Sequence, residues 1–193
     1  MEGRGSRELP DFDEEKFTVK AKKKPDLELG IRICRQDDLE DILDLQRLVY
    51  DKVPDKDTFV LSTRDEIKES LAQDVCIGVF HFGTLIAFTL MVVNRISKRN
   101  LAFSLGFDEE ICRSAVTFDT TFINPMYTGY GLQRFLSDMR EQYAIRLGAS
   151  AAYATVSPKN TVSLSNIMSR GFHIVAEKTM YGNYRRFILK KTF

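Results

Sequence analysis

The alternation of apolar and polar residues along the chain predicts a series of strands and amphipathic helices. In the segment 30–35 this alternation places Ile31 and Ile33 on one face, which is typical of a half-buried strand. The next segment, 37–53, carries apolar residues at helical spacing after an acidic first turn, so a helix is expected there. A second, shorter helix is expected over about 63–73, because its start has the pattern of a capping box.

The second half of the chain continues this mixture of strands and helices. Two apolar runs within 75–93, broken once at Gly83, predict a β-hairpin. The other expected elements are a short helix near 108–113, a strand at 115–123, a helix at 131–148, a strand at 150–156, a helix at 160–171 and two strands around Gly182. This order predicts an α/β (α+β) fold in which helices cover both faces of a mixed sheet.

The N-terminal segment 1–28 differs from the rest, because it is rich in charge and lacks apolar periodicity. A flexible leader is expected there, followed by a single domain over 29–193. The lysines of the leader are expected to form a solvated cluster: Lys20, Lys22, Lys23 and Lys24. The alternative of a nucleic-acid or membrane arm is disfavoured, since acidic residues surround these lysines.

Composition narrows the class of protein. The 28 basic and 27 acidic side chains nearly cancel, which argues against a nucleic-acid-binding protein. No run of 18 apolar residues and no secretory signal is visible, so no membrane association is expected. The cysteines, Cys34, Cys76 and Cys112, lack the spacing of a disulfide framework or a metal site and are expected to be buried in a reduced, cytoplasmic protein without a bound metal.

The segment after the strand at 115–123 carries the most informative pattern. Gly129 and Gly131 come just before an amphipathic helix, and both can adopt positive φ. Backbone N–H groups can therefore converge there with the positive end of the helix dipole, which would suit a pyrophosphate. A tight turn without a ligand remains the alternative on this stretch alone. The pattern matches neither a Walker A loop nor the dinucleotide-binding fingerprint.

The residues downstream extend this pattern into a resemblance to a known family. The turn contains Ile123, Pro125, Tyr127, Thr128, Gly129, Gly131, Leu132 and Gln133, and a later helix contains Asn160, Ser163, Gly171 and Phe172. In this order the chain resembles the GNAT family of acetyltransferases over about 30–193, most closely over 116–172. The resemblance implies the GNAT fold, with a mostly antiparallel central sheet and two parallel strands, 116–123 and 151–156, that splay apart at the cofactor slot.

The resemblance also implies a binding site for acetyl-CoA. The backbone of Phe122 and Ile123 would pair with the pantetheine amides, and Asn160, Ser163 and Ile167 would lie beside the pantetheine arm. The pyrophosphate would be held by the backbone N–H groups of Thr128, Gly129, Tyr130, Gly131, Leu132 and Gln133. Asn160 is equally suited to cap a helix, and the two roles are compatible.

Three residues depart from the family pattern. Thr128 stands where Arg or Gln is usual, and Gln133 stands where Gly or Ala is usual, so weakened but not abolished coenzyme A binding is expected. Ile167 occupies the position at which many members carry the Tyr that protonates the leaving thiolate. Replacement donors are therefore sought in Tyr181 and Tyr184, whose alternative role is that of ordinary strand aromatics.

Asp119 is the leading candidate for the general base, since a carboxylate within a strand is unusual unless it faces a cleft or a partner. A structural ion pair is the alternative role, and Glu177 is a second candidate base. The expected function is N-acetylation of a primary amine by direct transfer in a complex with acetyl-CoA, in a monomer or homodimer. An acyl-CoA-binding module without turnover is the alternative. The loops at 54–62 and 94–114 are expected to line the acceptor site.

Overall fold

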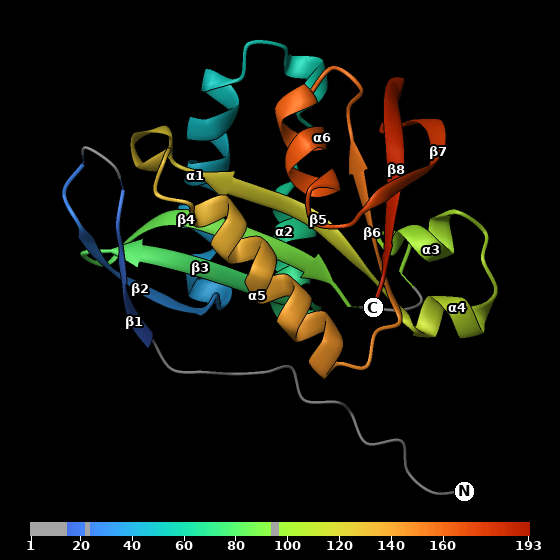
Figure 1. Ribbon diagram of the computed structural model, residues 1–193, viewed down its shortest axis with the longest axis horizontal. Coiled ribbons are helices and arrows are strands. Elements are labelled where there is room, and N and C mark those ends of the chain that lie inside the picture. The colour runs from blue at the N-terminus through green and yellow to red at the C-terminus, as the bar shows by residue number, and fades with distance from the viewer. Residues whose placement is uncertain (1–14, 22–23, 94–96) are drawn as a thin grey trace, which may run out of the picture.

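A computed structural model shows a single eight-stranded sheet with helices on both faces (Figure 1). The structure describes residues 15–21, 24–93 and 97–193. The strands are β1 (Glu15–Val19), β2 (Leu27–Ile33), β3 (Val75–His81), β4 (Thr84–Val92), β5 (Ala115–Ile123), β6 (Ala151–Val156), β7 (His173–Met180) and β8 (Tyr184–Thr192). Their order in the sheet is β1-β2-β3-β4-β5-β6-β8-β7. Only β5 and β6 pair in parallel, so the expected mostly antiparallel sheet is confirmed.

Helices α1 and α2 cover one face of the sheet, and α5 and α6 lie on the other (Figure 1). The helices are α1 (Leu39–Lys52), α2 (Arg64–Gln73), α3 (Leu101–Ser104), α4 (Glu109–Arg113), α5 (Leu132–Arg146) and α6 (Thr161–Met168), with short 3₁₀ turns η1 (Gln36–Asp38), η2 (Lys56–Thr58) and η3 (Pro125–Tyr127). The predicted capping box of α2 is present, with Thr63 and Glu66 each accepting the other's backbone N–H.

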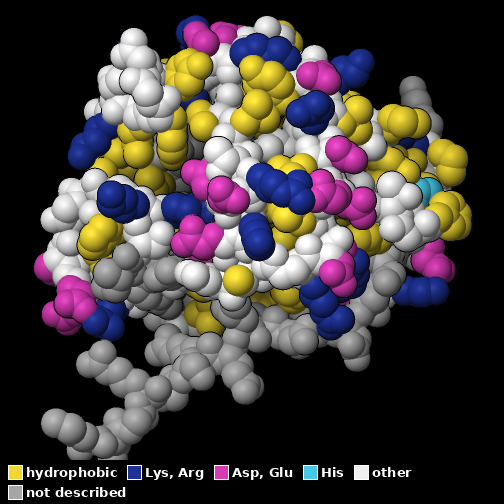
Figure 2. All heavy atoms as spheres, turned by 180° about the vertical axis from the view of Figure 1, so that it is seen from behind, with side chains coloured by type: hydrophobic (Ala, Val, Ile, Leu, Met, Phe, Trp, Pro, Cys, Tyr) yellow, Lys and Arg dark blue, Asp and Glu magenta, His cyan; other side chains and the backbone are white. Residues whose placement is uncertain are grey.

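The hydrophobic core is divided by the sheet. On the α5 side, Leu132, Leu136 and Tyr143 of the helix pack against the sheet. On the other side, Ile42 of α1 and Ile67 of α2 are fully buried. The three cysteines are buried, as expected, and burial is the main reason that the pKa of Cys34 and that of Cys76 are raised. On the face seen from behind, acidic and basic side chains are interspersed (Figure 2).

Part of the leader expected over 1–28 is a strand in the structure. Glu15–Val19 form β1, which pairs antiparallel with β2 from Glu15 opposite Ile31 to Val19 opposite Leu27. Phe17 of this strand stacks on Phe135 of α5, with ring centroids 4.5 Å apart. Residues 15–19 are therefore held by strand pairing and aromatic packing that no local sequence pattern reveals. Residues 1–14 and 22–23, including Lys22 and Lys23, lie outside the described residues.

Candidate active site

The sheet opens between β5 and β6. Their parallel pairing is limited to Ala115–Ala151, Val116–Ala152 and Thr117–Tyr153. Beyond these pairs β5 follows β4, and β6 follows β8. The expected splay is confirmed, and it leaves the edge of β5 facing a V-shaped gap instead of a neighbouring strand.

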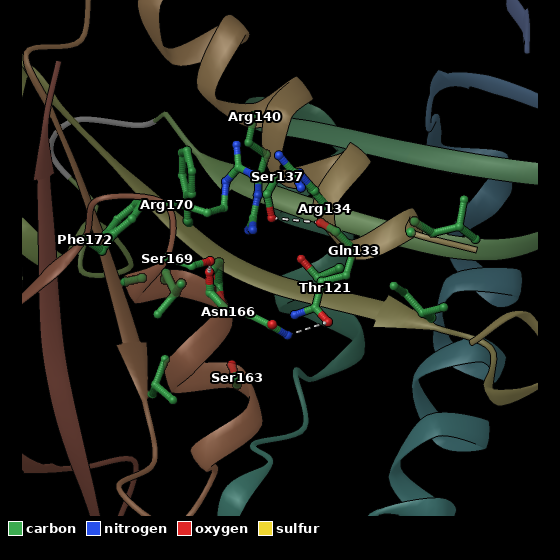
Figure 3. A pocket seen from close by; sticks show the side chains of 18 of the residues that line it. Thr121, Gln133, Arg134, Ser137, Arg140, Ser163, Asn166, Ser169, Arg170 and Phe172 are labelled. Atoms are coloured by element: carbon green, nitrogen blue, oxygen red, sulfur yellow. Dashed lines mark hydrogen bonds between the residues drawn. The ribbon is translucent and has the colours of Figure 1, made fainter. Parts of the chain in front are cut away.

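A cavity of about 770 Å³ lies on the α5 and α6 side of this gap (Figure 3). Eight of the predicted cofactor residues line it: Ile123, Thr128, Gly129, Gly131, Leu132, Gln133, Ser163 and Ile167. None of the residues of α6 is fully buried, and the helix lines the cavity while Leu164 and Ile167 pack against the edge of the core. The structure thus brings together residues from 123 to 167 in one hollow large enough for a ligand.

The turn before α5 has the geometry expected of an anion-binding cradle. Gly129 and Gly131 have φ values of 90° and 74°, which favour glycine, and Gly131 is the N-cap of α5. The helix has no side-chain cap and no acidic residue in its first turn. Its first N–H groups therefore remain available to a ligand beside the positive end of the helix dipole.

Two of the polar side chains that line this cavity were not expected from the sequence. Arg134, in the first turn of α5, is exposed and lines it. The side-chain amide of Asn166 donates to the Gln133 side chain at 3.5 Å, which connects α6 to α5 across the hollow (Figure 3). The sequence analysis missed both residues, although a cation in the first turn of a helix is a detectable departure from the usual acidic composition.

The other three predicted cofactor residues do not line the first cavity, although for Phe122 and Tyr130 only backbone groups were expected to bind. The Phe122 side chain is buried in the core on the α1 side, so only its backbone faces the gap. The Tyr130 hydroxyl donates to the carbonyl of Pro25 at 3.1 Å, away from the first cavity. Asn160 caps α6 by accepting the N–H of Ser163 at 3.0 Å and lines a second cavity. Its predicted role as a cap is therefore confirmed.

The second cavity, of about 430 Å³, lies on the other side of the gap. The loops expected at the acceptor site contribute 58–62 and several residues within 98–104 to its lining. Asp119, Thr121, Thr155 and Ser163 line both cavities, so the two hollows meet between the splayed strands. The lining carries both signs of charge.

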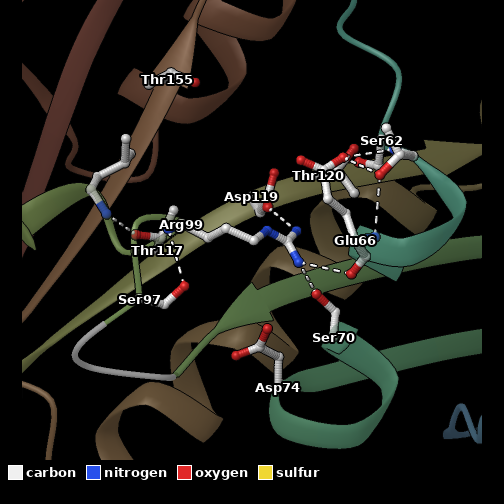
Figure 4. Close-up of polar contacts among 12 residues, drawn as sticks. Ser62, Glu66, Ser70, Asp74, Ser97, Arg99, Thr117, Asp119, Thr120 and Thr155 are labelled. Carbon is white, nitrogen blue, oxygen red and sulfur yellow. Dashed lines mark hydrogen bonds and ion pairs between the residues drawn. The ribbon is translucent and has the colours of Figure 1, made fainter. Parts of the chain in front are cut away.

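Asp119 is held in an ion pair. A bulge in β5, opposite the step from Leu90 to Met91, leaves Asp119 without a cross-strand partner and interrupts the alternation of side chains. Its carboxylate accepts from Arg99 at 2.6 Å, and Arg99 also donates to Ser70 of α2 (Figure 4). Burial alone would lower the pKa of Arg99, but the adjacent carboxylate outweighs it and raises the pKa.

The two candidate proton donors are placed differently. Tyr181 lines the second cavity, and its hydroxyl lies 3.2 Å from the Thr155 hydroxyl at the junction. Burial raises the pKa of Tyr181, more than its bond to Thr155 lowers it. Tyr181 has a φ of 54°, a conformation that costs about 1–2 kcal/mol outside glycine and that often marks functional sites.

The structure does not bring Tyr184 to either cavity; its ring lies 5.2 Å from the Arg186 guanidinium. Glu177 also lies outside both cavities and forms an ion pair with Arg185 at 2.5 Å. Among the described residues, no group of three or more potential ligands is arranged to hold a metal ion. No helix in the described ranges is long and apolar enough to cross a bilayer.

Comparisons with known proteins agree with this geometry. No family model and no curated protein sequence matches the chain. Solved structures do match: a GNAT-family acetyltransferase from Streptococcus pneumoniae has a TM-score of 0.63 and 18% identity, and the match covers 85% of this chain and 98% of that one. The ribosomal-protein-S18-alanine N-acetyltransferase from Escherichia coli has a TM-score of 0.64 and 14% identity, covering 85% and 93%.

Two further matches were solved with a ligand. The PaiA N-acetyltransferase from Thermoplasma acidophilum, in complex with coenzyme A, has a TM-score of 0.60 and 16% identity over 86% of this chain and 99% of its own. YncA from Salmonella typhimurium, a putative acetyltransferase with acetyl-CoA, has a TM-score of 0.61 and 16% identity over 85% and 93%. At these identities the likeness shows that the chain has the GNAT fold.

Proposed function

We propose that this chain with the GNAT fold is an N-acyltransferase that moves an acyl group from acetyl-CoA or a related acyl-CoA to a primary amine. The observation that carries the proposal is the meeting of two cavities at the gap between β5 and β6. One cavity has an anion cradle at its mouth, and the other is open to a second substrate. Such an arrangement lets a thioester and an amine approach each other from opposite sides of the sheet.

The residues of the first cavity fit coenzyme A. The N–H groups from Thr128 to Gln133 would hold its pyrophosphate, and the cation of Arg134 would offset the absence of a charged residue at Thr128. The backbone edge of Phe122 and Ile123 would pair with the pantetheine amides in the gap. Ser163 and Ile167 line the α6 side of that path, and Asn160 stands at its far wall.

The residues at the junction fit the chemistry of acyl transfer. The attacking amine must lose a proton, and Asp119 is the carboxylate that lines both cavities. As the amine nitrogen bonds to the carbonyl carbon, the carbon–sulfur bond breaks and the sulfur requires a proton. Like an ordinary tyrosine, whose pKa is about 10, Tyr181 is protonated at neutral pH, and its hydroxyl lies beside Thr155 at the junction. Tyr181 is therefore the proposed proton donor, in place of the tyrosine that many GNAT members carry at the position of Ile167.

A second function is an acyl-CoA-binding module without turnover. The apolar Ile167 in the first cavity favours it, because a proton donor is absent from that position. The ion pair between Asp119 and Arg99 also favours it, because an oxygen of the carboxylate that would take the proton of the amine already accepts from Arg99. In such a module the first cavity would bind acyl-CoA, and the second cavity would bind no amine that reacts with it.

Two measurements separate these functions. Calorimetry with acetyl-CoA tests binding, and a thiol-reactive dye measures coenzyme A release when a panel of small amines and peptide N-termini is supplied. Binding with amine-dependent release supports the transferase. Binding without release from any acceptor supports the module. Absence of binding at millimolar acetyl-CoA would rule out both.

A further inference from the structure

The side chain of Arg140 is buried in the wall of the first cavity. It lies on the third turn of α5 (Figure 3), and only 7% of its surface is exposed. Its guanidinium group stacks on the Phe118 ring at 4.5 Å. Within the described ranges its buried Nε has no hydrogen-bond acceptor. A buried charged group without a full set of acceptors is costly, so this arginine requires an explanation.

Among the residues that the structure describes, none forms a direct ion pair with Arg140, whereas its neighbour Arg170 has two. Arg170, which also lines the cavity, donates to Asp138 and, at 3.1 Å, to Glu141. Asp119 is the anion that most stabilises the charge of Arg140, yet its carboxylate is bonded to Arg99. Burial lowers the pKa of Arg140 to about 10, so it is still a cation at neutral pH.

Arg140 lies at the inner end of the cavity. Phe118, on which it stacks, directly follows Thr117, the last residue of β5 that pairs with β6. The cradle is at the other end, because Leu132 begins α5 and Arg140 follows eight residues, or about 12 Å, along the helix. A thioester that runs from the cradle to the gap would therefore present its acyl group toward Arg140.

We infer that the acyl group carried by this enzyme ends in a carboxylate, as in the coenzyme A thioester of a dicarboxylic acid such as succinate. This inference rests on the proposed function and names the acyl substrate of the same site. A guanidinium group binds a carboxylate through two parallel N–H donors, one of which can be Nε. The only acceptor of an acetyl group is its neutral thioester carbonyl, which is the reacting centre, whereas a terminal carboxylate would satisfy the unpaired donor and the charge together.

The test compares thioesters that differ at the acyl end. Calorimetry with coenzyme A, acetyl-CoA, butyryl-CoA and succinyl-CoA is expected to give succinyl-CoA at least a tenfold lower Kd than butyryl-CoA, which has a chain of the same length without the carboxylate. In Arg140→Met the ratio of these two affinities should fall to about one. Arg140→Lys should retain part of the preference, and Arg146→Met, an exposed site on the same helix, should retain all of it.

Three results would overturn the inference. Equal affinities for succinyl-CoA and butyryl-CoA in the unaltered protein would show that no carboxylate is recognised. Equal weakening of coenzyme A and all its thioesters in Arg140→Met would show that Arg140 holds the cofactor itself, and the proposed transferase would stand. Absence of heat with all four ligands would remove the proposed function as well. Thermal melting of each variant without ligand reports separately whether it is folded.

Discussion

The Lys24 ammonium group donates a hydrogen bond of 2.7 Å to the carbonyl oxygen of Thr128, in the turn that precedes α5. Lys24 also lies over the Tyr130 ring, 5.1 Å from its centroid, and the Tyr130 hydroxyl binds the carbonyl of Pro25. The segment before β2 thus holds the proposed cradle from outside. It supplies a cation beside Thr128, where the GNAT pattern has a charged or amide side chain.

Lys24→Met is therefore expected to weaken coenzyme A binding about three- to tenfold, because it removes a hydrogen bond and a charge near the pyrophosphate. The loss should shrink at high salt, since Lys24 is exposed and its field is screened. Calorimetry at two ionic strengths measures this, with Lys20→Met, on an exposed lysine of the same segment, as the control. Identical affinities for the two variants would contradict the prediction.

Gly131→Ala should reduce coenzyme A affinity at least tenfold. The substitution strains a backbone with a φ of 74° by about 1 kcal/mol and shifts the N–H groups that form the cradle. Gly106→Ala is a matched control, because Gly106 also has a positive φ and open space around its Cα, but it lies outside both cavities. Thermal melting is expected to show similar stability for the two variants. Calorimetry is expected to show a loss of coenzyme A affinity only in Gly131→Ala.

Tyr181→Phe should lower kcat about 10- to 100-fold with little change in the KM for acetyl-CoA, because it removes the proposed proton donor without touching the cradle. The pKa of Tyr181 is raised above the ordinary tyrosine value of about 10, so the hydroxyl of the unaltered protein stays protonated up to a higher pH. Activity should therefore begin to fall only above about pH 10. Tyr184→Phe, outside both cavities, is the control. Equal rates for both variants would exclude Tyr181 as the donor.

Asp119→Asn should lower kcat at neutral pH and recover part of it at high pH, because an amine acceptor that is already deprotonated needs no base. Pre-steady-state or steady-state rates from pH 7 to 9.5 measure the recovery. If Asp119 serves only to hold Arg99, the variant will lose thermal stability and show the pH profile of the unaltered protein. Glu177→Gln, which breaks an exposed ion pair outside the cavities, should leave the rates unchanged.

Arg140→Met should raise the unfolding free energy of the ligand-free protein by about 1–3 kcal/mol, because a buried cation gives way to an apolar chain of similar length. The pKa of Arg140 falls to about 10 in the folded chain, so the charge opposes folding below that pH. The penalty is complete at pH 7 and is relieved only as the pH rises through 10. Urea unfolding at pH 7 measures the gain; a loss of stability would show that Arg140 is structural.

The local sequence was sufficient for most elements and for the backbone geometry of the proposed cradle. The capping box of Thr63 and Glu66, the helix after Gly131 and the cap at Asn160 depend on residues a few positions apart, whose preferences are set by backbone dihedrals and nearby hydrogen bonds. The splay between β5 and β6 was expected from the resemblance, and the structure confirms it. The caps and the turn, unlike the splay, would form in any fold that contains these helices.

Only the tertiary structure decided which distant residues meet. Three contacts join positions that no sequence pattern links. They are the pairing of β1 with β2, the ion pair of Asp119 with Arg99 and the contact of Tyr181 with Thr155. The burial of Arg140 belongs to the same class, because a long cationic side chain on a helix is ordinarily solvated. Its environment depends on how α5 sits over the opened sheet, and that packing arises from the whole core rather than from neighbours in the chain.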